Sequence, residues 1–418
     1  MSSSFDKIAG GVVAAKGFRA HGVACGIKEP GADRLDLAAI VSDLPAVAAG
    51  VFTSNKVKAA PVRVSQAHIR EADVRAIVAN SGNANAATGV RGVADARAMA
   101  QAVASELGVR RRQVLVGSTG IIGIPLPMER IVPNVPGLIA GLSRGRGSDR
   151  AARAIMTSDT KPKHYAVELK IGASRVRIGG IAKGAGMICP DMATMLCFIT
   201  TDARIDKAEL QKAVACAAEH SFNRITIDGD MSTNDSVMVL ANGAAGNRPI
   251  RNGSPAAAAF RSALTRVMLK LAKAIVRDGE RVTKFVEVNV RGAATYLDAR
   301  RVAEAVAKST LVKCSWNGSD PNWGRILDAV GYSRARIKEE LVDVYFGGLL
   351  AAQNGMASPT PPEELKKIVA NHRFSVTIDL NLGDAEYVVY TSDLSQAYVE
   401  FNASEYNLMN RMLRERDA

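Results

Sequence analysis

Alternating apolar and polar positions predict the strands of this chain. Apolar side chains occupy every second position in residues 165–171 and 374–382, and Val286, Val288 and Val290 repeat the pattern. A period of two is typical of a strand with one face in a core and the other face more polar. We therefore expect sheets with one covered face rather than a fully buried parallel sheet.

Capping residues mark the helices that separate these strands. Ser254 and Pro255 form an N-cap and first-turn pair, and the apolar face that follows them ends near Gly279. Asp95 is a suitable N-cap for an alanine-rich helix that stops at Gly108. Strands that alternate with such helices predict the α/β class, with helices packed outside two sheets in a layered α-β-β-α sandwich.

Two stretches of unusual composition bear on the domain organisation. Residues 140–150 are rich in glycine, serine and arginine, which predicts a flexible surface loop. A shift in composition near residues 292–297 is the better candidate for a boundary. It divides the chain into a catalytic domain of about residues 1–292 and a smaller C-terminal α+β domain of about residues 293–418.

The composition limits the classes of partner. The 418 residues are 47% hydrophobic but only 5% aromatic, so the core must consist mainly of Ala, Val, Ile and Leu. The net charge of +13 is compatible with nucleic-acid binding. However, Lys and Arg are dispersed, and few aromatic residues stand among them to stack on bases. We therefore expect no nucleic-acid partner and favour a solvated basic surface, or a funnel for acidic small molecules.

Cysteine and histidine usage argues against a metal site and a secreted protein. The five cysteines are odd in number and widely spaced, which predicts buried free thiols rather than zinc ligands or disulfides. The five histidines form no ligand pattern, so we expect no metal. The N-terminus lacks an apolar signal segment, and no apolar run is long enough to span a membrane. The expected location is the cytoplasm.

The most informative segment is residues 183–200, where a loop punctuated by glycine and proline runs into an apolar strand, with Thr194 at the junction. A threonine at such a junction is usually structural. Cleavage between Ala193 and Thr194 would free an α-amine beside the Thr194 hydroxyl, and that amine is a built-in general base. Its ordinary pKa of about 7.7–8.0 suits the role.

Other polar loops supply the remaining parts of an acyl-transfer site. Thr119 and Gly120 offer a hydroxyl and a backbone N–H at a sharp bend, which are suitable donors for an oxyanion. Lys183 offers a cation for a substrate carboxylate, and Glu280 offers an anion for a substrate amine. A pair of opposite charges suits an amino acid. Taken singly, each of these loops is more often an ordinary turn or cap.

The segment around Thr194 resembles the self-cleavage signature of the ornithine acetyltransferase family, whose members are glutamate N-acetyltransferases. The resemblance extends over nearly the whole chain, because further family motifs follow in the same order. These motifs lie at residues 51–55, 154–160, 183–196, 320–325 and 390–394.

The resemblance implies a fold like that of the N-terminal-nucleophile hydrolases, with a connectivity shared with a group of aminopeptidases. It implies self-cleavage into an α chain, 1–193, and a β chain, 194–418, which assemble as an α2β2 heterotetramer. The implied reaction moves an acetyl group from N2-acetylornithine to glutamate through acetyl-Thr194, without a cofactor. Some members of the family also accept acetyl-CoA as a donor, and this is the second activity to test.

The resemblance also implies roles for individual residues. Thr119 and Gly120 form the oxyanion hole. Substrate binding falls to five residues, which are Thr157, Lys183, Thr194, Glu280 and Asn402.

The chain departs from the family pattern in two places. Arg281-Val282 follows Glu280 where the family usually has Gly-Ala, and an arginine there is able to pair with Glu280 and alter substrate choice. The C-terminus carries an extra residue after Asn402 and a basic tail. An amidohydrolase or aminopeptidase with an N-terminal nucleophile is the alternative, because water is also able to resolve an acyl-enzyme.

Overall fold

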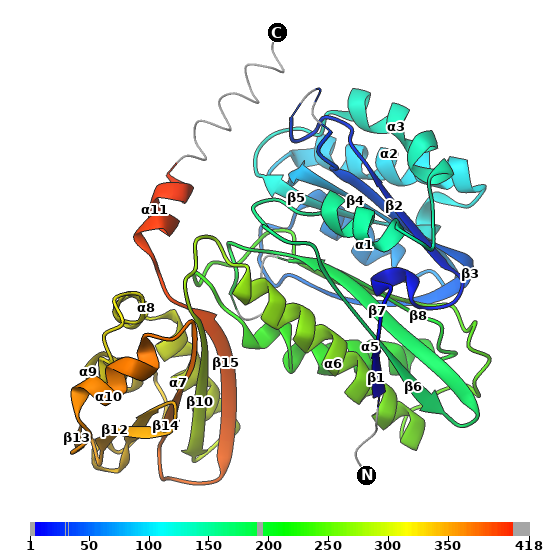
Figure 1. The fold of residues 1–418 in the computed structure, drawn as a ribbon. Coiled ribbons are helices and arrows are strands. Elements are labelled where there is room, and N and C mark those ends of the chain that lie inside the picture. The colour runs from blue at the N-terminus through cyan, green and yellow to red at the C-terminus, as the bar shows by residue number, and fades with distance from the viewer. Residues whose placement is uncertain (1–4, 30, 32, 190–194, 404–418) are drawn as a thin grey trace. The chain divides into compact units, whose positions relative to one another are not determined.

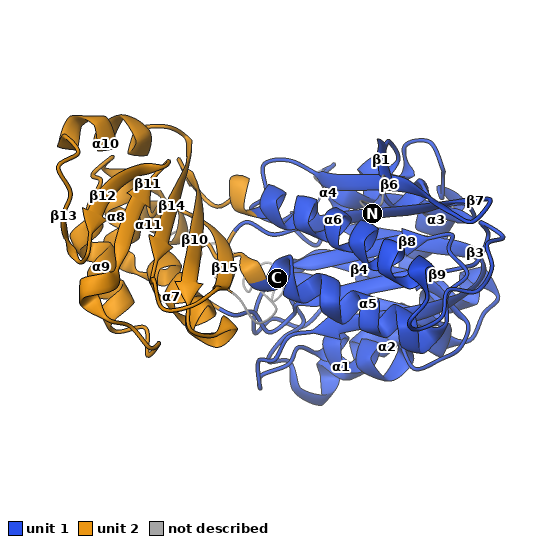
Figure 2. Ribbon diagram, turned by 90° about the horizontal axis from the view of Figure 1, so that it is seen from below, with its two compact units in different colours: residues 1–185, 191–223, 231–275 blue, residues 186–190, 224–230, 276–418 orange. Residues whose placement is uncertain are grey.

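The computed structural model describes residues 5–29, 31, 33–189 and 195–403, which fall into two compact units (Figure 2). Unit 1 comprises the described parts of residues 1–185, 191–223 and 231–275, and unit 2 comprises those of 186–190, 224–230 and 276–418. Among the described residues, no helix combines the length and the apolar character needed to cross a bilayer.

Unit 1 contains a nine-stranded arrangement flanked by helices (Figure 1). Its strands are β1 (Phe5–Ile8), β2 (Phe18–Val23), β3 (Leu37–Phe52), β4 (Val74–Asn83), β5 (Val114–Ile121), β6 (Lys163–Ile171), β7 (Ser174–Lys183), β8 (Leu196–Thr201) and β9 (Ser236–Ala241). Its helices are α1 (Ala60–His68), α2 (Gly89–Leu107), α3 (Met128–Ala140), α4 (Gly147–Ala154), α5 (Lys207–Glu219) and most of α6 (Pro255–Arg277).

The long strand β3 belongs to two sheets. Its first part pairs with β2 and β4, and its last part, from Val47 to Phe52, pairs with β9. The register with β4 shifts between Val41 and Ala46, where such an irregularity bends a strand. The strand order is β1-β6-β7-β8-β9-β3-β4-β5, with β2 also on β3. One strand therefore joins β2, β4 and β5 to the sheet that ends at β1.

The alternation of side chains along β3 shows how the layers stack. Ala38 and Ile40 pack in a buried cluster with Phe198 of β8, which belongs to the other sheet. Leu37 and its neighbours on the opposite face pack with Met99 of α2 and with residues of α1 and α3. On the far sheet, α6 lies against β7, because Leu271 approaches Gly180. The layer order is α-β-β-α, which confirms the predicted sandwich.

Unit 2 is smaller and has a six-stranded sheet of order β13-β12-β11-β14-β10-β15. Valines of β10 and β14 pack with helices α7 and α8, and the Trp316 and Phe374 rings meet edge to face at 6.0 Å. The strands are β10 (Phe285–Ala293), β11 (Asp343–Phe346), β12 (Leu349–Gln353), β13 (Met356–Ala357), β14 (Arg373–Asp379) and β15 (Ala385–Ser392). The helices are α7 (Tyr296–Lys308), α8 (Thr310–Asn317), α9 (Trp323–Gly331), α10 (Pro362–Val369) and α11 (Gln396–Asn402).

Several predicted elements are present, with bounds that differ by a few residues from those expected. The strands predicted at residues 165–171 and around Val288 are β6 and β10, and the helix that begins at Pro255 is α6. The strand predicted at residues 374–382 ends at Asp379, because Asn381 adopts a left-handed backbone conformation with φ +50°. The boundary predicted near residue 292 falls within unit 2, at the turn between β10 and α7.

Three predictions from local pattern were wrong. The helix expected from Asp95 begins at Gly89, because its first turn packs against Asn85 and Thr88. Residues 140–150 are not simply a flexible loop, since α4 begins at Gly147, where a Cβ would lie 2.1 Å from the carbonyl oxygen of Ala20. The five cysteines are all free thiols, but Cys216 and Cys314 are exposed rather than buried.

The contact between the two sheets of unit 1 depends on Phe198, which is 1% exposed and faces Gly117 of β5. We expect Phe198→Ala to lower the free energy of unfolding by about 3–5 kcal/mol, because it leaves a cavity between the sheets. Urea unfolding measures the change. Leu44→Ala removes a side chain that is 44% exposed and is the control, with an expected change within about 0.5 kcal/mol. Equal losses in the two variants would contradict this account.

Candidate active site

The predicted site residues fall into two groups, one in each unit. In unit 1, Lys183 is the last residue of β7, and its side chain is almost fully buried. Its Nζ donates hydrogen bonds to Oγ1 of Thr157, at 2.6 Å, and to Oγ1 of Thr119, at 3.2 Å. Thr119 lies near the end of β5, and Thr157 follows α4. The fold thus brings together three residues that are at least 26 positions apart in the sequence.

The direction of these hydrogen bonds has a chemical consequence. A lysine ammonium only donates, so both threonine hydroxyl oxygens accept from Lys183. Each hydroxyl therefore keeps its own hydrogen for another acceptor. For Thr119 this leaves an O–H donor of the kind that stabilises a developing oxyanion, as its predicted role requires.

Gly120 occupies a position that admits no side chain. Its φ is +135°, and a Cβ would lie 2.2 Å from the carbonyl carbon of Gly82, its register partner on β4. Gly82 in turn lies against Lys28, whose Cα would be 3.2 Å from a Cβ at position 82. Two glycines therefore allow the backbones of three segments to approach closely beside Thr119.

A buried carboxylate organises this group, and sequence reasoning assigned it no role. Asp159 Oδ1 accepts from Lys163 Nζ at 2.6 Å and from the Gly184 amide at 2.8 Å, and Oδ2 accepts from the Thr157 amide at 3.0 Å. Burial by itself would raise the pKa of Asp159, but the charges of Lys183 and Lys163 and these hydrogen bonds lower it to about 2. The signal in the sequence that was available for Asp159 was its position two residues after Thr157, a predicted site residue.

A second buried carboxyl, Asp235, binds Met195, the residue that follows the predicted nucleophile. Ala193 and Thr194 lie outside the described residues, but the Met195 amide donates to Asp235 Oδ1 at 2.9 Å. The Ser236 amide donates to the Met195 carbonyl at 3.1 Å. Burial raises the pKa of Asp235 well above its ordinary value, although the Met195 amide and the charge of Lys183 oppose the shift. The residue that follows Thr194 is therefore fixed at both its amide and its carbonyl.

The segment before Asp235 also supports strand β5, which carries Thr119. Asn234 is buried, and its Nδ2 donates to the carbonyl oxygens of Ser118, at 2.9 Å, and Ala84, at 2.6 Å. These bonds hold the backbone next to Thr119. Sequence reasoning noted this polar loop but did not assign it a partner, because the partners lie more than 100 residues away.

Lys28 and Arg34 add positive charge near Thr157. Arg34 Nη2 donates to the Thr157 carbonyl at 2.9 Å, and Lys28 Nζ donates to the Leu35 carbonyl at 2.7 Å. Burial, and then the charges of Arg34 and Lys183, lower the pKa of Lys28 to about 7, although two carboxylates oppose the shift. Sequence reasoning missed both cations.

In unit 2, the predicted residues Glu280 and Asn402 are in contact. Asn402 Nδ2 donates to Glu280 Oε2 at 3.1 Å and to the Tyr398 carbonyl at 3.0 Å. The Glu280 carboxylate packs against Gly186, where a Cβ would lie 2.4 Å from Oε2. Glycine at position 186 thus leaves the space that the carboxylate occupies.

Arg281 is the first of the two places at which the chain departs from the family pattern. Its backbone is left-handed, with φ +55°, which is a conformation that glycine adopts without strain. Its guanidinium lies 5.0 Å from the centre of the Phe401 ring, within the range of a cation–π contact.

Asp228 of unit 2 holds the segment that precedes the predicted cut. Its Oδ2 accepts from the Met187 amide at 2.6 Å, and its Oδ1 accepts from the Ile188 amide at 2.8 Å. The Tyr398 hydroxyl donates to Oδ2 at 3.2 Å. Burial raises the pKa of Asp228 to about 6 despite these hydrogen bonds.

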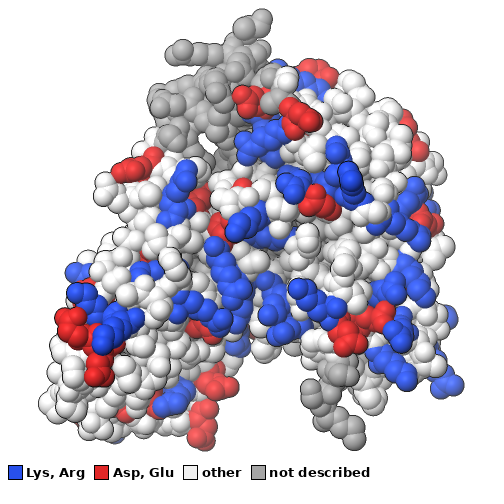
Figure 3. Space-filling view, in the orientation of Figure 1, with Lys and Arg blue, Asp and Glu red and all other residues white. Residues whose placement is uncertain are grey.

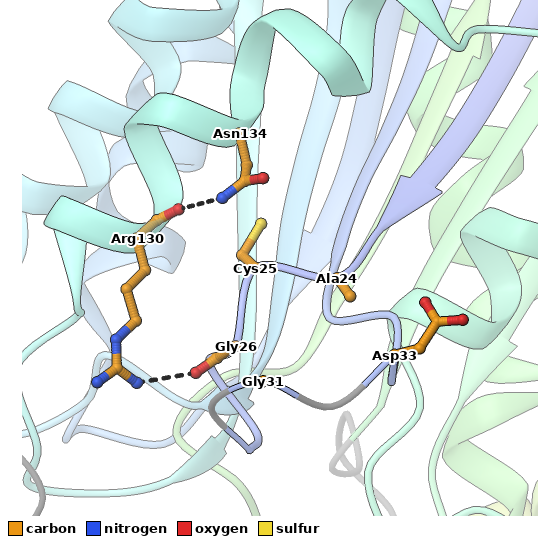
Figure 4. A pocket seen from close by; sticks show the side chains of 7 residues that line it. All are labelled: Ala24, Cys25, Gly26, Gly31, Asp33, Arg130 and Asn134. Carbon is orange, nitrogen blue, oxygen red and sulfur yellow. Dashed lines mark hydrogen bonds between the residues drawn. The ribbon is translucent and has the colours of Figure 1, made fainter.

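An open pocket elsewhere in unit 1 lies between residues 24–33 and helix α3 (Figure 4). Arg130 of α3 points toward the loop and donates to the Gly26 carbonyl at 3.0 Å, while Asn134 donates to the Arg130 carbonyl. The lining of this pocket includes none of the predicted site residues. Within the part of the chain that the structure describes, no group of three His, Cys, Asp or Glu side chains is arranged to hold a metal ion.

Charged side chains are interspersed on the face seen in Figure 3, where basic residues outnumber acidic ones. This distribution follows from the dispersed positions of Lys and Arg in the sequence. Positive charge that is dispersed in this way is suited to attracting acidic small molecules, and it does not form a single basic stripe on this face.

The titration of Asp159 gives a testable pH dependence. Its pKa of about 2 in the folded protein lies below the ordinary 3.8, so its charge stabilises the fold above pH 3.8 and this contribution is lost as the pH falls toward 2. We expect Asp159→Asn to be less stable than the wild type near neutral pH. The difference should shrink between pH 4 and pH 2 in urea unfolding series. A difference that stays constant over that range would contradict the assignment.

The sequence is similar to those of known proteins over most of its length. The ArgJ family profile matches residues 19–407. The arginine biosynthesis bifunctional protein ArgJ of Geobacter sulfurreducens is 51% identical over 389 residues, covering 93% of this chain and 98% of that protein. The glutamate N-acetyltransferase of Methanocaldococcus jannaschii is 46% identical, covering 95% of this chain and 98% of that protein.

A solved structure is also similar in sequence. The ornithine acetyltransferase of Mycobacterium tuberculosis complexed with ornithine is 40% identical, with a TM-score of 0.41, covering 45% of this chain and 98% of that one. With the family profile and near full-length relatives above 45% identity, the conclusion is direct: this chain belongs to the ArgJ family.

Proposed function

We propose that this protein transfers an acetyl group from N2-acetyl-L-ornithine to L-glutamate in arginine biosynthesis. Membership of the ArgJ family and the relative named glutamate N-acetyltransferase support the reaction class. The observation that carries the proposal is the buried Lys183 ammonium bound to the hydroxyls of Thr119 and Thr157. It places a cation for a carboxylate next to a donor for an oxyanion.

The first half-reaction forms acetyl-Thr194. The Thr194 hydroxyl attacks the acetyl carbonyl of acetylornithine, and the α-amine of Thr194 takes the hydroxyl proton. The Thr119 hydroxyl and the Gly120 amide donate to the oxyanion, a contribution of roughly 10²–10³ in rate for each such donor. The C–N bond then breaks, and the proton moves to the leaving amine of ornithine.

The second half-reaction reverses these steps with a new amine. The α-amine of glutamate attacks the acetyl ester, loses a proton to the α-amine of Thr194, and releases N-acetylglutamate as the Thr194 hydroxyl recovers its proton. Lys183 and Thr157 hold the substrate carboxylate. Glu280, oriented by Asn402, holds a substrate amine.

The free α-amine requires self-cleavage, which we include in the proposal. The Thr194 hydroxyl attacks the Ala193 carbonyl, the peptide becomes an ester, and water hydrolyses that ester. The products are the α chain, 1–193, and the β chain, 194–418. We further infer an α2β2 heterotetramer in the cytoplasm, where five free thiols suit the reducing conditions.

Self-cleavage predicts two bands near half size for the purified protein on a denaturing gel. Thr194→Ala removes the attacking hydroxyl and should leave a single band of about 44 kDa. Thr201→Ala is a control at a threonine within β8, and its product should still be cleaved. A wild type that is active while whole would contradict the mechanism.

The transferase assay measures ornithine release from N2-acetylornithine with and without glutamate. We expect release only when glutamate is present. Release without glutamate would indicate a hydrolase, in which water resolves the acyl-enzyme, and would contradict the proposed function. Replacing acetylornithine by acetyl-CoA tests the second donor that the family resemblance implies for some members, and N-acetylglutamate formation is the readout.

A further inference from the structure

The turn that carries Glu280 needs support from outside itself. It connects the end of α6 to β10, and residues 278–284 belong to neither element. Arg281, the next residue, has a left-handed backbone with φ +55°, a conformation that costs a residue with a Cβ free energy. Such a backbone persists only where neighbouring groups fix it. Other parts of unit 2 must therefore hold this turn.

Asp393 provides three hydrogen bonds to the turn. It is buried and lies in the motif at residues 390–394, directly after β15. Its Oδ1 accepts from the amides of Thr283 and Lys284, each at 2.9 Å. Its Oδ2 accepts from Thr283 Oγ1 at 2.6 Å, and also from Asn317 Nδ2 of α8 at 2.7 Å. One carboxylate thus fixes the backbone that follows Arg281.

Ser395 adds a contact from the same segment. Its Oγ donates to the Arg281 carbonyl at 2.7 Å. The same oxygen accepts from the Tyr398 amide at 3.1 Å and caps α11, the helix that carries Asn402. One hydroxyl therefore joins the turn of Glu280 to the helix whose Asn402 donates to the Glu280 carboxylate.

We propose that Asp393 is a positioning residue for Glu280 and that it sets the preference for an acetyl donor with a free δ-amine. In N2-acetylornithine the α-nitrogen is an amide, so the δ-amine is the cation that a carboxylate is able to bind. Asp393 acts through the backbone of Thr283 and Lys284 and not on the substrate. Without its charge the turn relaxes, and Glu280 leaves the position that pairs with the amine. The inference rests on the proposed function, in which Glu280 holds a substrate amine.

The test compares two acetyl donors that differ only in this amine. N2-acetyl-L-norvaline is acetylornithine without its δ-amine, and N-acetylglutamate formation measures transfer from either donor. The wild type should prefer acetylornithine in kcat/KM by about tenfold or more, the scale of a hydrogen bond between charged groups. Asp393→Asn should remove most of this preference, chiefly by raising the KM for acetylornithine. A loss of folded enzyme alone would lower transfer from both donors equally and leave the preference unchanged.

Exchanging the two partners of the hydrogen bond between Asp393 and Asn317 provides the rescue. In the double variant Asp393→Asn, Asn317→Asp, the amide nitrogen at position 393 is able to donate to the new carboxylate and to Thr283 Oγ1, while the amide oxygen still accepts from the two backbone amides. This variant should recover most of the preference. Asn317→Asp alone places two carboxylates together and should lower it.

Two further variants complete the set. Asp384→Asn is the matched control, because it makes the same substitution at an exposed position between β14 and β15, and it should keep the preference of the wild type. Thr283→Val removes the hydroxyl that donates to Asp393 at an exposed residue. It should lower the preference by about threefold, the scale of a single hydrogen bond, and it decides the question if Asp393→Asn does not fold.

The outcomes separate this inference from the proposed function. A wild type that forms no N-acetylglutamate from acetylornithine overturns the proposed function and the inference with it. A wild type that uses the two donors equally well keeps the transfer reaction and overturns the inference alone. An unchanged preference in Asp393→Asn, or no recovery in the exchanged pair, also overturns it. If Asp393→Asn does not fold, an unchanged preference in Thr283→Val does the same.

Discussion

The carboxylate of Asp159 is the interaction on which the candidate site of unit 1 depends. It lies in a core built from Ala, Val, Ile and Leu, where an ionised group is stable only when charges and hydrogen bonds surround it. Lys163, the Gly184 amide and the Thr157 amide supply those partners from β6, the end of β7 and the segment after α4. One buried charge thus ties three elements together at the place where Lys183 must be held.

Glycine contributes to the site by leaving space rather than by flexibility. Gly82 and Gly120 let β4, β5 and the segment at Lys28 approach within distances that a Cβ would prevent. Gly186 does the same for the Glu280 carboxylate in unit 2. The closest of these approaches is at Gly120, where a Cβ would lie 2.2 Å from the carbonyl carbon of Gly82, so a larger residue would force the strands apart. Catalysis by positioned donors is sensitive to shifts of about an ångström.

The sequence alone was sufficient to predict the fold class and the types of residue at the site. It was not sufficient to predict which other residues those side chains contact. Alternation and capping identified β6, β10 and α6, because these signals are local. The Asp95 and 140–150 predictions failed because contacts with Thr88 and Ala20 decided the structure there. The sequence predicted Thr119, Thr157 and Lys183 as site residues, but it did not predict that they contact one another. Asp159, Asn234 and Lys28 were missed because their importance comes from partners distant in the chain, and no local pattern carries that information.

The strand order has a consequence for the chain after a cut before Thr194. Strands β8 and β9 would then belong to the second chain, yet they lie between β7 and β3 of the first, bonded to both. The two chains are interleaved within one sheet, so they cannot separate without breaking its central ladders. Folding as one chain closes these contacts within a single molecule, whereas refolding of the separated pieces would depend on their concentration. If the chain is cut there, the uncut precursor would be the form in which these strands pair, and the cut form would be held together by the strand ladders of the shared sheet.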